Sequence, residues 1–239
     1  MLVQQEYNQY TISDHEVWSV LYKRQYEKVA DVAYNKFKWG LDQLEFNDQK
    51  IPDFKEVNKK LKGLTGWQIY AVPGLISNAD FFNKMYTREF GTTTWIRKMQ
   101  ELDYLEEPDM FHDVFGHIPL LTDTRITHFL YELAALAVKH LDKEEVIEAI
   151  ARVYWYTIEF GLVKENKQVK IYGAGILSSI GETEYSLSSA AVHVPFQINE
   201  VIHTPYIKDR FQEKYFVLDH FDQLAHAAQE LNHFFSSLY

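Results

Sequence analysis

Two histidines five positions apart impose the strongest constraint on how this chain can fold. His112 and His117 belong to the segment 108–117, PDMFHDVFGH. In a regular α-helix, side chains at i and i+5 point about 140° apart, so an unbroken helix cannot direct both imidazoles to one ion. Gly116 and the nearby Pro119 therefore predict a break in the helix that turns His117 inward.

Glu159 is the candidate third member of a metal site. It lies in the apolar and aromatic segment 153–162, VYWYTIEFGL, where a carboxylate is rarely buried without a partner or a metal. Two imidazoles and one carboxylate can hold one face of an octahedral ion, as in non-haem Fe(II) oxygenases that handle O2. The alternative is that the histidines are structural and Glu159 faces solvent or pairs with Arg152. Spacing alone leaves both interpretations open.

Several other classes of protein fit the sequence poorly. Asp113 follows the first histidine and position 116 is not a histidine, so the His-Glu-x-x-His pattern of zinc proteases is missing. The chain has no cysteine, which excludes disulfides, thiolate zinc sites and cysteine nucleophiles. A formal net charge of -10 disfavours nucleic acids and anionic membranes as partners. With no apparent signal peptide or membrane span, we expect a cytoplasmic protein.

The hydrophobic pattern predicts one α+β domain over 1–239, predominantly helical with a few short strands. Ser13 and Glu16 have capping-box spacing at the start of the first helix. We expect helices over about 14–41, 52–63, 124–140, 144–162 and 219–235, and one beginning after Ser77. We expect strands over 67–72, 92–97, 167–172 and 215–218.

Three segments resemble the signature of a known family. They are 106–120 (EEPDMFHDVFGHIPL), 153–162 (VYWYTIEFGL) and 172–182 (YGAGILSSIGE). In content, order and separation they resemble the pterin-dependent aromatic amino acid hydroxylases, most of all the single-domain bacterial members that act on phenylalanine. The resemblance extends from about Trp18 to Val217. It implies hydroxylation of L-phenylalanine to L-tyrosine with non-haem Fe(II), a tetrahydropterin and O2.

The resemblance also implies roles for individual residues. By likeness, the iron ligands are His112, His117 and Glu159. The residues expected beside the pterin are Phe81, Leu75, Ile76, Tyr154 and Asp113. The family usually has Glu at the last of these positions, so Asp113 is one methylene shorter.

A second set of residues is implied for the amino acid substrate. Arg97 matches the arginine that binds the substrate carboxylate, and Asp109 is expected to orient it. Trp155 and Pro108 match walls of the ring pocket. Gly175 and Ser178 match the loop at the end of the substrate site, and Ser178 is also expected to contact a ligand imidazole.

Other functions stay open from the sequence. The same chemistry on tryptophan or tyrosine is one alternative, because the charged loop 206–211 lies near the expected pocket. A metal-dependent hydrolase and a non-catalytic helical binding protein are the others. With no segment corresponding to a regulatory or tetramerisation domain, we expect a monomer.

Overall fold

The computed structural model describes residues 3–238 apart from 104, 106 and 209. The helices are α1 (Ile12–Val29), α2 (Asn35–Leu44), α3 (Phe54–Leu64), α4 (Asn78–Tyr86), α5 (Thr124–Lys139), α6 (Glu144–Tyr154), α7 (Ala174–Leu177), α8 (Ile180–Ser186), α9 (Ile198–His203) and α10 (Asp222–Leu238). The strands are β1 (Gln68–Val72), β2 (Glu89–Thr93), β3 (Leu162–Glu165), β4 (Gln168–Ile171), β5 (Val192–Pro195) and β6 (Lys214–Leu218). The predicted α+β, mainly helical fold is confirmed.

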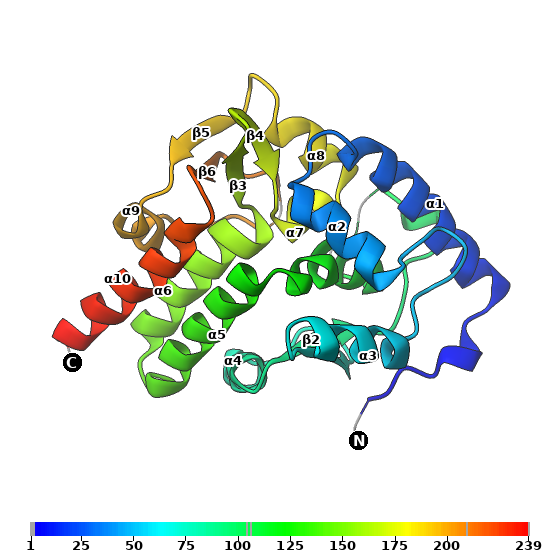
Figure 1. The fold of residues 1–239 in the computed structure, drawn as a ribbon, viewed down its shortest axis with the longest axis horizontal. Helices are drawn as coiled ribbons and strands as arrows, with labels where there is room; N and C mark the ends of the chain where they lie inside the picture. Colours follow the sequence, from blue (N-terminus) through cyan, green and yellow to red (C-terminus); the bar gives the residue numbers. More distant parts are fainter. Residues whose placement is uncertain (1–2, 104, 106, 209, 239) are drawn as a thin grey trace.

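Two small sheets accompany the helices (Figure 1). Strands β1 and β2 pair in parallel, and the second sheet has the order β4-β3-β6-β5. The β3–β4 pair is an antiparallel hairpin, whereas β6 runs parallel to both β3 and β5. Within the described ranges, none of the helices combines the length and the apolar character that crossing a bilayer requires.

The first predicted helix is wrong as a single element, because the chain forms α1 and α2 instead. Between them Ala33 forms a bridge with Ile171 of β4, and Tyr34 donates its backbone N–H to the Ile171 carbonyl at 2.8 Å. Pairing with a strand far along the chain therefore interrupts a pattern that looked continuous. The helix also begins earlier than expected, since Thr11 and Asp14 form the capping box.

The strand predicted over 92–97 is shifted, because β2 ends at Thr93. The following residues leave the sheet. The carbonyl of Thr94 accepts the Tyr10 hydroxyl at 2.6 Å, and that of Trp95 accepts the Met110 N–H at 2.9 Å. The bond between Trp95 and Met110 places the segment that contains Arg97 beside the segment that contains the two histidines.

Aromatic packing anchors that segment from behind. Phe111 and Phe115 stack at 4.9 Å between ring centroids. Trp18 of α1 meets Phe111 at 5.6 Å, and Phe37 of α2 meets Phe115 at 5.5 Å. All four side chains are buried, and each such burial contributes on the order of 1.5–3 kcal/mol. The turn between the histidines is thus fixed to the core on one face and free to present its ligands on the other.

Candidate metal centre and its cavity

Both ligand-bearing segments are π-helical turns. One spans His112–His117 and the other Trp155–Glu159. A π turn closes its hydrogen bond between residues five apart, so positions i and i+5 stand one above the other. His112 and His117 therefore share a face without any break in the helix, and the predicted break at Gly116 is wrong. A Cβ at Gly116 would lie 2.8 Å from the Ala174 carbonyl oxygen. The role of this glycine is therefore to allow the close approach of α7, not to break the helix.

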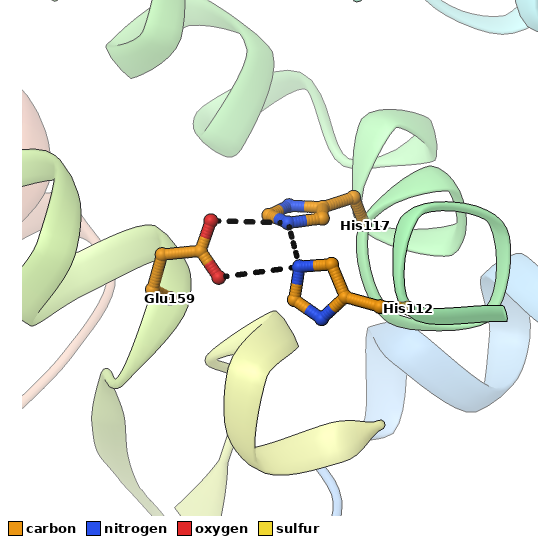
Figure 2. A group of neighbouring side chains, drawn as sticks. All are labelled: His112, His117 and Glu159. Atoms are coloured by element: carbon orange, nitrogen blue, oxygen red, sulfur yellow. Dashed lines mark hydrogen bonds and ion pairs between the residues drawn. The ribbon is translucent and has the colours of Figure 1, made fainter. Parts of the chain in front are cut away.

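The three predicted ligands converge (Figure 2). Nε2 of His117 lies 3.2 Å from Nε2 of His112 and 3.1 Å from Oε1 of Glu159. Nε2 of His112 lies 3.7 Å from Oε2 of Glu159. The alternative prediction, that Glu159 pairs with Arg152, is wrong. Arg152 instead donates hydrogen bonds to Oε2 of Glu148 and to the Ile202 carbonyl.

This donor set fits one Fe(II) ion. Metal–ligand bonds of about 2.0–2.2 Å place neighbouring donors of an octahedral ion roughly 3 Å apart, close to the separations of these atoms. Each residue offers one ligand atom, and these atoms all lie within 4.8 Å of one another. Two imidazoles and one carboxylate without a thiolate are the donors of mononuclear non-haem iron, and they leave coordination positions open.

Ser178 fixes the tautomer of His112. Its hydroxyl donates to the Ala174 carbonyl at 2.8 Å, and its oxygen lies 2.9 Å from Nδ1 of His112. Because the hydroxyl proton is already used, the Ser178 oxygen accepts the proton on Nδ1. Nε2 of His112 then carries the lone pair that a metal needs.

Replacing Ser178 with Ala is expected to weaken metal binding by about 10–100-fold, the usual effect of removing a partner that orients a ligand imidazole. Titration of the apoprotein with Co(II) measures this change. Ser189→Ala, at an exposed loop position, serves as the control. An unchanged Co(II) affinity in Ser178→Ala would remove Ser178 from this role.

The charges of the cluster are strongly linked. Burial would raise the pKa of Glu159, but His117 and His112 outweigh it and lower the pKa to about 2. Burial would also lower the pKa of His117, yet the attraction and hydrogen bond of Glu159 raise it. The pKa of His112 is lowered, chiefly by burial. Without a metal, the cluster therefore favours a proton on His117 beside an ionised Glu159.

A metal must displace this proton, which gives its affinity a defined pH dependence. The pKa of His117 lies above its usual 6.5, so protonation competes already above that pH. We expect the Co(II) affinity to fall by about 10-fold per pH unit as the pH decreases through and below the His117 pKa. Co(II) titrations between about pH 6 and about pH 8 test this, and a flat profile would contradict it.

A cavity of about 260 Å³ opens on the three ligands. It is lined mainly by aromatic and apolar side chains, as small-molecule sites usually are. The sequence-predicted residues that line it are Leu75, Ile76, Phe81, Pro108, His112, Asp113, His117, Tyr154, Trp155 and Glu159. Most residues expected beside a pterin or a substrate ring therefore share one space with the candidate metal centre.

The wall expected beside a pterin contains Phe81, Tyr154 and Asp113. The rings of Phe81 and Tyr154 meet edge-on at 5.3 Å, and the Tyr154 ring also faces that of His117 at 6.5 Å. Oδ2 of Asp113 accepts the backbone N–H and the hydroxyl of Thr93 at 2.7 and 2.8 Å. No role was predicted for Thr93 from the sequence. Its two hydrogen bonds hold the carboxylate of Asp113, whose side chain is shorter than the usual Glu, against β2.

Arg97 and Asp109 form a buried ion pair, and neither residue is among those that line the cavity. Nε and Nη2 of Arg97 donate to the two carboxylate oxygens of Asp109 at 2.9 and 2.8 Å. Asp109 also accepts the backbone N–H of His112 at 3.1 Å. Burial would raise the pKa of Asp109, but Arg97 outweighs it and lowers the pKa. The orienting contact predicted for Asp109 is present, and it connects Arg97 to the first ligand.

Gly175 and Trp155, both expected at the substrate site, differ in their relation to the cavity. A Cβ at Gly175 would lie 2.9 Å from the Phe160 ring and 3.1 Å from the Glu159 carbonyl oxygen, so α7 packs closely on the second π turn. Gly175 therefore has a packing role in the structure and does not line the cavity. Trp155 does line it, together with Tyr206 and Lys208 of the charged loop 206–211. Asp209 of that loop lies outside the described residues.

The fold and this site define a helical metalloprotein with a facial two-histidine, one-carboxylate centre. The family model for biopterin-dependent aromatic amino acid hydroxylases matches residues 5–239. This chain belongs to that family.

Individual relatives agree with the match. The chain is 43% identical over 223 residues to phenylalanine-4-hydroxylase of Chromobacterium violaceum, covering 92% of this chain and 74% of the relative. It is 42% identical over 221 residues to the Pseudomonas aeruginosa enzyme, covering 92% and 84%. The C. violaceum crystal structure with Fe(III) and 7,8-dihydrobiopterin superposes with a TM-score of 0.92 at 40% identity, covering 98% and 85%.

Proposed function

We propose that this protein is a phenylalanine 4-monooxygenase that uses Fe(II), a tetrahydropterin and O2 to convert L-phenylalanine to L-tyrosine. The convergence of His112, His117 and Glu159 at the floor of an aromatic-lined cavity carries the proposal. The relatives support the choice of substrate, since an iron- and phenylalanine-bound structure of the C. violaceum enzyme superposes with a TM-score of 0.89 at 39% identity.

Each part of the site has a distinct task in this proposal. His112, His117 and Glu159 hold the iron and leave one face of it open toward the cavity. The iron and the reduced pterin together supply the electrons for O2 activation, which no side chain here provides. The protein contributes positioning, exclusion of water and the buried charge of Glu159.

The two organic molecules are assigned to different walls. We assign the pterin to Phe81, Leu75, Ile76, Tyr154 and Asp113, where one aromatic face and one carboxylate border the cavity. A buried carboxylate with one oxygen held by Thr93 can accept hydrogen bonds from ring N–H groups with the other.

We assign the amino acid to the side of Trp155 and Pro108. Arg97, with its guanidinium oriented by Asp109, is the proposed partner of the substrate carboxylate. Ser178 and Gly175 act indirectly in this proposal. Ser178 orients the imidazole of His112, and Gly175 allows α7 to pack closely on the second π turn.

Aerobic turnover of phenylalanine, tyrosine and tryptophan side by side tests the proposal. We expect tyrosine from phenylalanine only when Fe(II), a tetrahydropterin and O2 are all supplied. Faster turnover of tryptophan or tyrosine would reassign the substrate. No tyrosine under these conditions, together with metal-dependent hydrolysis of an ester or amide without pterin or O2, would instead favour a metal-dependent hydrolase.

We also propose that the protein is a cytoplasmic monomer. The cysteine-free sequence suits a reducing compartment. Light scattering coupled to size-exclusion chromatography tests the monomer, and a larger mass that is independent of concentration would contradict it.

A further inference from the structure

Gln212 is a buried polar residue that joins two parts of the cavity wall. Its side chain lies just before β6 and is 2% exposed. Nε1 of Trp155 donates to Oε1 of Gln212 at 2.9 Å. Nε2 of Gln212 in turn donates to the Ile207 carbonyl at 2.8 Å. One amide group thus uses its acceptor on the indole and its donor on the loop that follows α9.

The backbone of Gln212 is itself fixed from behind. Its N–H donates to Oε1 of Glu182 at 3.3 Å, and the Tyr215 hydroxyl donates to the same oxygen. Glu182 belongs to α8 and Tyr215 to β6, and both side chains are buried. Elements of the rigid core therefore determine where the amide of Gln212 stands.

In front of Gln212, two aromatic rings form a continuous surface of the cavity. Trp155 and Tyr206 stack with centroids 4.6 Å apart and planes 23° from parallel, and both line the cavity. The Ile207 carbonyl that Gln212 binds lies directly after Tyr206 in the chain. A single side chain therefore fixes both partners of the stack, one through its ring nitrogen and the other through its backbone.

We propose that Gln212 is a positioning residue for the aromatic substrate, because its amide fixes the stacked Trp155–Tyr206 wall against which the substrate ring packs. This inference rests on the proposed function and deepens it. An apolar residue at 212 leaves the Trp155 N–H and the Ile207 carbonyl without these partners, and unpaired buried polar groups are costly. The wall then loses its fixed orientation, whereas the hydrogen bonds described for Gln212 go to Trp155, Glu182 and Ile207 and to none of the three metal ligands.

The Gln212→Met variant tests the inference, since Met keeps the length and flexibility of the side chain without the amide. We expect its Kd for phenylalanine to rise about 10-fold, the factor that corresponds to one or two lost neutral hydrogen bonds. Equilibrium dialysis of phenylalanine against the Fe(II)-loaded enzyme without O2 measures the Kd independently of turnover. Under turnover, KM should rise by a similar factor, while kcat and iron content stay close to the wild-type values.

Gln25→Met is the matched control. Gln25 is also a buried glutamine with one amide hydrogen bond, to Thr183 at 2.9 Å, but it lies on α1 and does not line the cavity. Its replacement should leave the Kd for phenylalanine unchanged. Equal losses of affinity in both variants would overturn the inference, because they would indicate general loosening of the core.

A double mutant identifies the route of the effect. If Gln212 acts through Trp155, then Gln212→Met should add little to the loss of affinity that Trp155→Phe causes alone. Fully additive losses would overturn the inference. Should Gln212→Met not fold, Gln212→Glu keeps an acceptor for the indole and should weaken binding less than Trp155→Phe does; a greater loss would also overturn it. Wild-type enzyme that neither binds nor hydroxylates phenylalanine would refute the proposed function instead.

Discussion

The Glu159→Ala variant is expected to bind Fe(II) or Co(II) at least about 100-fold more weakly than the wild type and to lose turnover, since even partners of ligands contribute 10–100-fold. Glu159 is the only anionic member of the trio, and His117 and His112 hold its pKa at about 2. Its removal leaves two neutral imidazole ligands and no negatively charged ligand to attract a divalent ion. Co(II) titration and the iron content of the purified variant measure the loss.

Glu148→Ala provides the control for Glu159→Ala. Glu148 lies in α6, just ahead of the same π turn, and makes an exposed ion pair with Arg152 at 3.1 Å. Its loss should change neither metal affinity nor turnover. Wild-type iron content in Glu159→Ala would remove this residue from the metal centre.

The Asp109→Ala variant is expected to lose about 3–5 kcal/mol of stability, the range for breaking a buried ion pair by removing one partner. Asp109 is 0% exposed, and its partner Arg97 is 9% exposed. Without the carboxylate, the Arg97 guanidinium and the His112 N–H both lose a buried acceptor. Urea unfolding followed by circular dichroism measures the change.

The contribution of Asp109 has a defined pH dependence and a clear control. Its pKa is lowered in the folded state from 3.8. The stabilisation is therefore complete above that value and is lost as the pH falls through the folded pKa. Asp219→Ala breaks the exposed pair with Lys164 and should leave the unfolding midpoint unchanged. A similarly small effect of Asp109→Ala would show that the Arg97 pair does not stabilise the fold.

The sequence predicts the members of the metal centre better than the way they come together. His112, His117 and Glu159 could be selected because their chemistry and flanking motifs are local in the chain. The π turn that aligns the two histidines leaves no such signal, since it depends on aromatic packing behind Phe111 and Phe115. The break expected at Gly116 is therefore a widening of the helix instead.

Long-range pairing explains the other differences. The division of the first helix depends on the bridge between Ala33 and Ile171, which lie far apart in the sequence. Gln212 escaped notice for the same reason, because a single glutamine in the segment 210–215 (RFQEKY) has no motif or periodicity. Its role follows only from contacts with Trp155 and Glu182 in three dimensions.

The most direct test of the central claim is the source of the oxygen atom in the product. Turnover of phenylalanine with Fe(II) and a tetrahydropterin under O2 labelled with heavy oxygen should give tyrosine whose ring hydroxyl carries the label, as expected for a monooxygenase. The Glu159→Ala variant should form no labelled tyrosine. Unlabelled tyrosine, whose hydroxyl oxygen would come from water instead of O2, or no tyrosine from the iron-loaded wild-type protein, would contradict the account.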